Sequence, residues 1–154
     1  MTKSAMPYEN LGDALATDYF YVREQFSDEQ WQHFLATRRF VDSEVLPVIN
    51  GYWEAAELPW PLMRRLPELG LLGEDIAGYG CPGMTPLARG LVNMELHRGD
   101  GSLGTFLGVQ SGLAMKSIAL LGSDTQKQRW LQAMARLEGT GRLTDPIARP
   151  GQAQ

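Results

Sequence analysis

The chain has 154 residues, 44% hydrophobic and 21% charged, with a formal net charge of −4. These values are typical of one globular domain. Basic residues are scattered apart from the pairs Arg38-Arg39 and Arg64-Arg65, so the sequence offers no basic stripe to nucleic acid. Cys81 is the only cysteine, which excludes an intrachain disulfide and fits a reducing compartment. Because no apolar run follows a basic N-terminus, we expect no secretory signal and a cytoplasmic location.

The sequence pattern divides the chain into three parts. Residues 1–26 have no helical period and predict an irregular lead-in, whereas residues 27–138 carry helix caps and apolar periods. Residues 139–154 are rich in glycine and proline and predict an irregular tail. No stretch of the chain alternates as a strand would. The middle part therefore predicts an all-α fold, a helical bundle of five or six helices.

Capping residues and prolines predict where the helices of the first half begin and end. Ser27 and Gln30 have the spacing of a capping box, which opens a helix. Pro47 is expected to end or kink this helix because it lacks an N–H, and a second piece follows through Tyr52. Residues 59–61 predict a corner. A short apolar helix face follows; Pro67 interrupts it, and the glycine at position 70 ends it. Residues 73–84 contain four glycines, at positions 73, 78, 80 and 83, and predict a loop or a short extended stretch.

The second half predicts three further helices. Thr85-Pro86 is an N-cap followed by proline at the first helical position, and this helix extends to Gly99. Ser102 is expected to cap a long helix that ends at Leu121. A second capping box, at residues 123–126, opens the last helix, which Gly139 is expected to close.

Two glycine patterns fit Gly-x-Gly-x-x-Gly, one at residues 78–83 and one at residues 99–104. A dinucleotide fingerprint must follow a strand and open a helix. The first pattern follows no convincing strand and the second follows a helix. We therefore interpret these residues as loop and cap glycines.

Gly104, Gly108 and Gly112 form a row of small residues four positions apart. Such rows let another backbone approach closely, and the apolar stretch around them raises the question of a membrane span. Gln110, Ser111, Lys116 and Ser117 interrupt that stretch, whereas a span needs about 20 nearly uncharged residues. A buried helix in a bundle is the preferred interpretation. The alternative is that Gly104 and Gly108 leave room for a ligand.

Few residues suggest a catalytic or metal-binding role. His33 and His97 are the only histidines and lack the spacing of metal ligands, so no metal site is expected. Cys81 could be a nucleophile, but a single small residue in a Gly-Pro loop is more often structural. Glu95 and Asp100 are the carboxylates nearest the glycine-rich helix start. A solvated helix face explains them as well as a general base does, so no catalytic residue is assigned.

Three stretches resemble the N-terminal helical domain of acyl-CoA dehydrogenases. They are Leu-Pro-Glu-Leu-Gly-Leu-Leu-Gly at 66–73, Gly-Tyr-Gly-Cys-Pro-Gly at 78–83 and Leu-Gly-Ser-Asp-Thr-Gln-Lys-Gln-Arg-Trp-Leu at 121–131. Their order and spacing match that family, and the likeness covers residues 17–138. The Gly-Tyr-Gly-Cys loop and the Val-Gln-Ser tripeptide at 109–111 are most similar to the glutaryl-CoA dehydrogenase branch and to short-chain acyl-CoA oxidases.

The resemblance implies a FAD-dependent oxidation of an acyl-CoA thioester between its α and β carbons. In that family a glutamate takes the α proton and the flavin accepts the β hydride. Its members have a helical, a β-barrel and a second helical domain, and the first domain forms one wall of the acyl pocket and helps to build the oligomer. Flavin contacts and the glutaryl branch's catalytic base come mainly from the later domains. The resemblance thus implies acyl-CoA and a homo-oligomer as partners.

Departures from the family pattern limit this implication. The segment 143–146, Leu-Thr-Asp-Pro, is similar to the start of a family flavin motif, so Leu143 and Thr144 are the candidate cofactor-binding residues, but no Gly-Ser pair follows. We therefore expect a truncated or frame-shifted family member, or an isolated domain. On its own, such a chain is expected to be catalytically inactive and to have no bound FAD. The glutaryl branch's Arg-Ser pair aligns with Gly104 and Thr105, and the missing arginine makes a dicarboxylyl substrate doubtful.

Gly104, Thr105 and Gly108 are the predicted substrate-binding residues, because an apolar and roomy wall suits a simple acyl chain. The leading hypothesis is thus the N-terminal domain of an acyl-CoA dehydrogenase. The alternative is a non-catalytic helical module that works through self-association or a separate partner, since an isolated domain would expose apolar surface. An acyl-CoA oxidase relative is a third possibility.

Overall fold

The computed structural model describes residues 22–138. After the 3-10 turn η1 (Val22–Gln25), its helices fall into six segments, one of which, α4 with α5, is interrupted at Arg64. The bounds are α2 (Asp28–Phe40) with the π-helix η2 (Val41–Val45), α3 (Ile49–Ala55), α4 (Trp60–Met63) with α5 (Arg65–Glu68), α6 (Pro86–Gly99), α7 (Gly101–Leu107) with the π-helix η3 (Gly108–Met115) and α8 (Lys116–Leu121), and α9 (Asp124–Ala135).

The predicted all-α class is confirmed, with one small addition. Strands β1 (Ala77–Gly78) and β2 (Cys81–Pro82) pair antiparallel inside the predicted loop at 73–84. Tyr79 joins them with a φ of 56°, between glycines that also have positive φ. This agrees with the short extended stretch that was one of the two predictions for this segment, but strands of two residues are too short to show an alternating pattern, so their pairing was not predicted.

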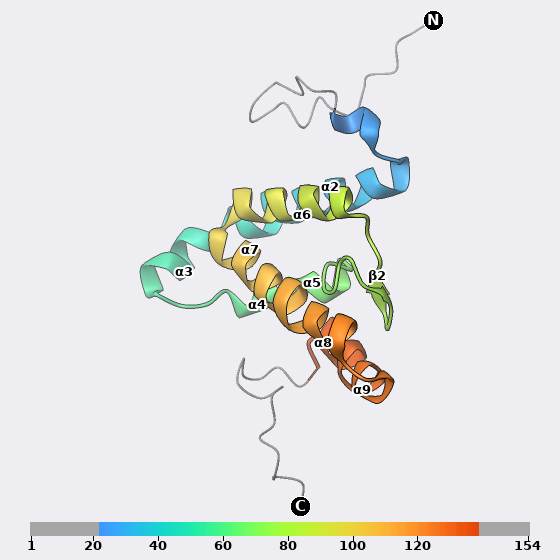
Figure 1. The fold of residues 1–154 in the computed structure, drawn as a ribbon. Coiled ribbons are helices and arrows are strands. Elements are labelled where there is room, and N and C mark those ends of the chain that lie inside the picture. The colour runs from blue at the N-terminus through green and yellow to red at the C-terminus, as the bar shows by residue number, and fades with distance from the viewer. Residues whose placement is uncertain (1–21, 139–154) are drawn as a thin grey trace, which may run out of the picture.

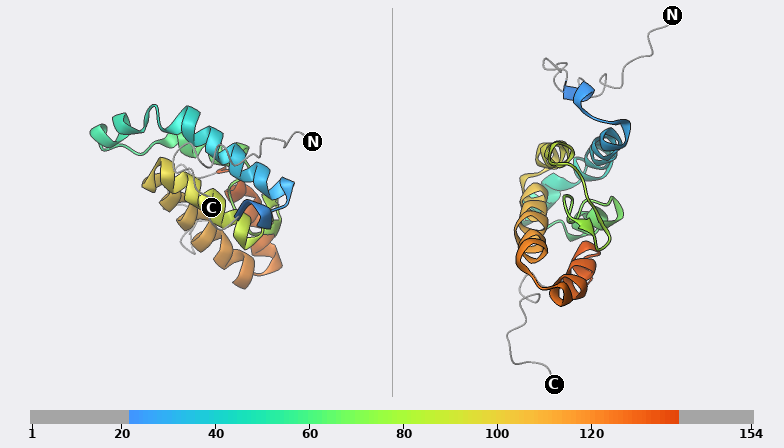
Figure 2. Two further views of the ribbon diagram at one scale, coloured as in Figure 1. Left: turned by 90° about the horizontal axis from the view of Figure 1, so that it is seen from above. Right: turned by 45° about the vertical axis from the view of Figure 1, so that its right-hand side comes forward.

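The helices form two layers that meet at a corner. Helices α2 and α6 lie side by side, and the chain then turns at Asp100 so that α7, η3 and α8 continue as one run down the body (Figure 1). Helix α9 returns beside the end of that run, while α3 projects at the opposite end, beside the start of α7 (Figures 1 and 2).

The core is built by α2, η2, α6 and α7 together with α4, α5, α9 and the segment after α5. Trp31 and Phe34 of α2 are fully buried and their rings stack at a centroid distance of 4.4 Å. At the end of α6, a Cβ added to Gly99 would lie 2.7 Å from Cγ1 of Val41. The close approach of α6 to η2 therefore depends on a residue without a side chain.

The predicted helix starts are confirmed at three positions. Ser27 and Ser123 each form a complete capping box with the glutamine three residues later. The Thr85 hydroxyl accepts a hydrogen bond from the Ala88 amide, and proline follows at the first helical position. These caps satisfy amides that have no partner inside the helix.

Other boundaries differ from the predictions. Asp100, not Ser102, caps α7. The first helical run ends at Val45, before the expected break at Pro47, and the break between α4 and α5 falls at Arg64 while Pro67 lies inside α5. Helix α9 ends at Ala135, and Gly139 lies outside the described residues.

The interpretation of the apolar stretch as a buried helix is correct for one part of it only. In α7 and η3 one face is buried, but α8 contains no buried residue. None of the helices within residues 22–138 has both the length and the apolar character that crossing a membrane requires.

Candidate functional site

An apolar hollow of about 380 Å³ lies between the α3–α4 connection and the outer face of α7. Phe106 forms part of its lining, and the Trp60 ring of α4 packs edge-on against this phenylalanine at 6.3 Å. The complete lining consists of Leu58, Met63, Gly101, Ser102, Thr105, Phe106 and Val109. Only two hydroxyls interrupt this apolar surface, which gives it the character of a small-molecule pocket wall.

The Asp100 carboxylate holds the two sides of this region together. One of its oxygens accepts a hydrogen bond from the Leu103 amide at 3.0 Å, and the other accepts one from Trp53 Nε1 at 2.7 Å. Asp100 thereby caps α7 and fastens α3 to its start. A second hollow of about 290 Å³ lies beside the first, lined in part by Tyr52 and Trp53, and the two share Leu58 and Ser102.

The three predicted substrate-binding residues have different surroundings. Thr105 is exposed and lines the hollow. A Cβ added to Gly108 would meet nothing within 4 Å, so the space beside it is open. Gly104 is buried on the side of α7 that faces α6, and a Cβ there would lie 2.4 Å from the His97 ring. In this structure His97 therefore fills the room at Gly104.

His97 is exposed, and its ring makes a polar contact with the preceding turn of α6. Its Nδ1 lies 2.8 Å from the carbonyl oxygen of Asn93, and a carbonyl can only accept, so Nδ1 carries the proton in this arrangement. The pairing of His97 with Gly104 across the corner between α6 and α7 has no signature in the sequence, and it was missed there.

The solvated-face interpretation of Glu95 and Asp100 is wrong, because their exposed fractions are 2% and 5%. Glu95 accepts a hydrogen bond from Arg98 Nε at 2.8 Å and lies 3.6 Å from Arg38 Nε. Burial lowers the pKa of Arg98, but hydrogen bonds to Asp42 and Glu95 outweigh it and leave that pKa raised. Both candidate bases therefore have structural partners.

Polar contacts fix the loop at 73–84 on the neighbouring helices. The Gly73 amide donates to Ser111 Oγ at 2.9 Å, and Asp75 accepts hydrogen bonds from Arg89 at 3.0 Å and from Lys116 at 2.8 Å. A Cβ at Gly73 would lie 2.6 Å from Cys81 Sγ. The loop is thus attached to α6, η3 and α8 together.

Cys81 is half-buried in this loop. Burial raises the pKa of the Cys81 thiol, and the nearby Glu74 carboxylate raises it further. A raised pKa keeps the thiol protonated at neutral pH and weakens it as a nucleophile. The environment favours the structural interpretation of this cysteine.

The glycines of the two Gly-x-Gly-x-x-Gly patterns do not form a cradle for a dinucleotide. Gly78 and Gly80 belong to the β1–β2 hairpin rather than to a turn that opens a helix, while Gly99 and Gly104 pack against Val41 and His97. Leu143 and Thr144, the candidate cofactor-binding residues, lie outside the described residues. Within residues 22–138 no cluster of three or more His, Cys, Asp or Glu side chains could hold a metal ion.

Comparison with known proteins identifies the class. The sequence model of the family "Acyl-CoA dehydrogenase, N-terminal domain" matches residues 27–138 of this chain. The fold is similar to a glutaryl-CoA dehydrogenase from Mycobacterium smegmatis solved in complex with FADH2. The TM-score is 0.71 at 36% identity, over 76% of this chain and 30% of that one.

Two curated relatives agree. The chain is 30% identical to a probable acyl-CoA dehydrogenase of Bacillus subtilis, over 95% of this chain and 26% of that protein. It is 34% identical to a (2S)-methylsuccinyl-CoA dehydrogenase of Cereibacter sphaeroides, over 71% of this chain and 20% of that protein. The chain therefore belongs to the acyl-CoA dehydrogenase family, whose N-terminal domain it contains, and it spans only 20–30% of the length of these three relatives.

Proposed function

We propose that this chain serves α,β-dehydrogenation of an acyl-CoA thioester by supplying one wall of the acyl-binding pocket. The hollow beside α7 carries this proposal, because Thr105 lies in its lining and the space at Gly108 is open. An apolar wall with few hydroxyls suits a simple acyl chain. Gly104 faces α6 under the His97 ring, and neither residue lines this hollow, so the proposal for Gly104 has no support from it.

We propose that FAD, the cofactor of the family, is not retained by this chain alone. Since neither Gly-x-Gly-x-x-Gly pattern forms a dinucleotide cradle, no flavin contact is assigned to its glycines. Leu143 and Thr144 remain the proposed cofactor-binding residues. We further propose a cytoplasmic homo-oligomer that encounters acyl-CoA as a soluble ligand, and the single, half-buried Cys81 fits a reducing compartment.

Three measurements on the purified chain test these proposals. Its visible absorption spectrum should lack a flavin band, and no acyl-CoA should be dehydrogenated; a band at one flavin per chain would overturn the cofactor proposal. In an NMR titration with butyryl-CoA, the amides of Thr105 and Gly108 should shift while that of Thr125 on α9 stays in place. The variant Thr105→Trp, which fills the hollow, should remove those shifts, and Thr125→Trp should not.

A second candidate function is a non-catalytic helical module that acts through association. Exposed leucines on η3 and α8 favour it: Leu113, Leu120 and Leu121 have exposed fractions of 64%, 68% and 86%. If butyryl-CoA leaves every amide in place while the chain self-associates, this second function replaces the first.

A further inference from the structure

The second hollow, which lies beside α3, continues the hollow that is proposed above to hold the acyl chain. The two share Leu58 and Ser102 and therefore meet along one border. Their volumes are about 380 Å³ for the acyl hollow and about 290 Å³ for the one beside α3. Each is near the lower end of the range of small-molecule pockets, which is roughly 300–1,000 Å³. A group too long for the acyl hollow therefore reaches the second one over this border.

The second hollow, called the α3 hollow below, combines a buried apolar part with aromatic side chains. Ile49 and Pro59 are its buried members. Tyr52 is half-buried and Trp53 is exposed, so both rings remain accessible to a ligand. Aromatic side chains provide a large apolar contact area, and they pair with other rings in preferred geometries.

The indole of Trp53 is accessible but held in place. An exposed side chain ordinarily changes rotamer within nanoseconds, and the exposed fraction of Trp53 is 66%. Here Nε1 donates a hydrogen bond to Asp100 at 2.7 Å, and Asp100 is buried and also accepts one from the Leu103 amide. A ligand that binds against this ring therefore has little of its motion left to restrict, which favours binding.

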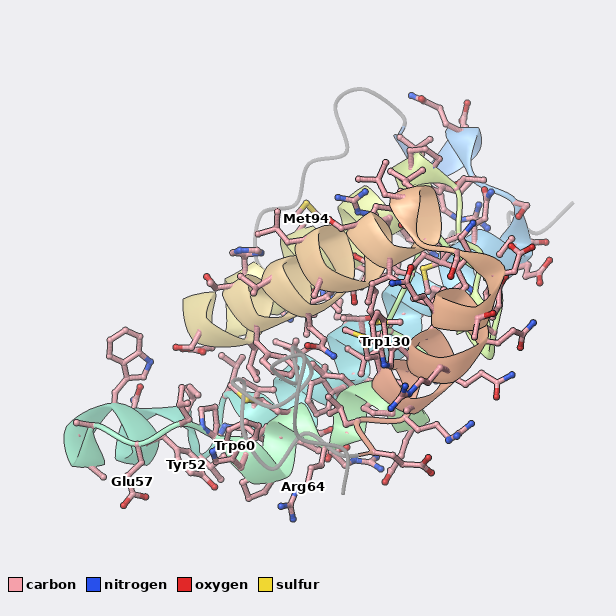
Figure 3. All side chains as sticks on the ribbon, turned by 60° about the horizontal axis from the view of Figure 1, so that its bottom comes forward. Tyr52, Glu57, Trp60, Arg64, Met94 and Trp130 are labelled. Atoms are coloured by element: carbon pink, nitrogen blue, oxygen red, sulfur yellow. The ribbon has the colours of Figure 1, made fainter. Side chains whose placement is uncertain are left out.

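The two hollows offer no partner to a negatively charged group. Among the described residues that line them, Glu57 alone carries a charge. Figure 3 shows Glu57 at the tip of α3, directed away from the body, and Tyr52 on the side nearer Trp60. A carboxylate at the far end of an acyl group would find no cation here and would be repelled by Glu57. The α3 hollow therefore selects a neutral end group.

We propose that the acyl group of the substrate ends in a neutral aromatic ring, which lies in the α3 hollow against Tyr52 and Trp53 while the chain beside the thioester lies along Thr105. An apolar cavity of about 150 Å³ already admits benzene, and the α3 hollow has about 290 Å³. A single row of methylene groups would leave part of that volume without contacts. This inference names the substrate class of the acyl hollow and rests on the function proposed above.

Three thioesters, each titrated into the full chain and followed by NMR, test the proposal. Butyryl-CoA should shift the amides of Thr105 and Gly108 only. The compound 4-phenylbutyryl-CoA, which adds a ring to the same chain, should also shift the indole N–H of Trp53, whose signal the variant Trp53→Phe identifies. It should bind about tenfold more tightly, because half of a buried phenyl group accounts for that factor. Decanoyl-CoA, with as many acyl carbons as 4-phenylbutyryl-CoA, should bind less tightly than it.

A pair of tyrosine variants tests whether the α3 hollow provides this advantage. Tyr52→Ala should remove at least half of the tenfold difference on a logarithmic scale and leave the affinity for butyryl-CoA unchanged. Tyr79→Ala is the matched control, because Tyr79 is also half-buried but lines neither hollow, and it should keep the full difference. Circular dichroism checks that both variants are folded.

The outcomes separate this inference from the proposed function. Equal affinities for butyryl-CoA and 4-phenylbutyryl-CoA, or an unmoved Trp53 indole, would overturn the inference, while shifts of Thr105 and Gly108 would keep the function. Tighter binding of decanoyl-CoA would replace the aromatic class by an alkyl one. Equal losses in Tyr52→Ala and Tyr79→Ala would place the ring outside the α3 hollow. If no thioester moves Thr105 or Gly108, the proposed function fails and this inference with it.

Discussion

Helix α6 and the run from α7 to α8 are both apolar helices, yet they are packed differently. Helix α6 buries Ala88, Leu91 and Val92 against its neighbours. Helix α8 buries no residue and ends in two leucines that are largely exposed. Apolar content alone thus predicts that a helix forms, but the elements available to cover it decide whether it becomes core or surface.

The largest contrast should appear when one apolar side chain is removed from α2, in the core beside α6, and one from α8. Phe34→Ala deletes a fully buried ring that stacks on Trp31 and should lower the free energy of unfolding by about 3–5 kcal/mol. Leu121→Ala removes a side chain that is 86% exposed and should change it by less than about 0.5 kcal/mol. Urea denaturation of both variants at low protein concentration measures the difference; equal losses would show that α8 is covered in solution.

A methyl group added at a glycine in each region should have effects of opposite sign. Gly99→Ala places a Cβ 2.7 Å from Cγ1 of Val41, and because a β-branched side chain cannot rotate away easily, we expect a loss of about 1–3 kcal/mol. Gly112→Ala meets nothing within 4 Å and should gain up to about 1 kcal/mol from helix propensity. Thermal unfolding of the two variants at low concentration shows whether each substitution raises or lowers the stability. A loss of stability in Gly112→Ala would contradict an open face at that glycine.

The corner between the two regions depends on Asp100. Asp100→Ala removes the cap of α7 and the acceptor of Trp53 Nε1, which should cost about 1–2 kcal/mol. Ser102→Ala, at the residue that the sequence suggested as the cap, should cost less than about 0.5 kcal/mol. The fluorescence of Trp53 should change only in the first variant. A larger loss of stability in Ser102→Ala than in Asp100→Ala would instead support Ser102 as the cap of α7.

The sequence predicted the caps at Ser27, Thr85 and Ser123 because each is a bond between residues three apart. Both Asp100 and Ser102 are good cap residues, and the choice between them depends on Trp53, 47 positions away. The family, and with it the fold class, could be recognised because its motifs are also local.

The candidate site was less accessible to sequence reasoning. Glu95 and Asp100 were judged by their place on a helix, but their burial depends on Arg38, Arg98 and Trp53 from other turns or helices. The room expected at Gly104 is filled by His97, seven residues earlier and across a corner. The assignment of Gly104, Thr105 and Gly108 to an acyl pocket stays a prediction.

The smallest expected effect concerns Asp75, which links the two regions through Arg89 of α6 and Lys116 of α8. Burial raises the pKa of this carboxyl, but the hydrogen bond from Lys116 and the charge of Arg89 outweigh it, so the pKa lies below its ordinary value of 3.8. A lowered folded-state pKa adds stability above the ordinary pKa, and this stability is lost as the pH falls through the lowered value.

Asp75→Asn should therefore reduce stability at neutral pH and flatten its decline below about pH 4. Urea midpoints from neutral to acidic pH measure that slope. Lys116→Met should flatten the decline in the same way, because it removes the hydrogen-bond partner that lowers the pKa of Asp75. Glu138→Gln is the control: the hydrogen bond from Arg136 lowers the pKa of Glu138 as well, but that pair is exposed and solvent screens it. If Asp75→Asn keeps the wild-type slope while Glu138→Gln changes it, the link between α6 and α8 does not depend on this carboxylate.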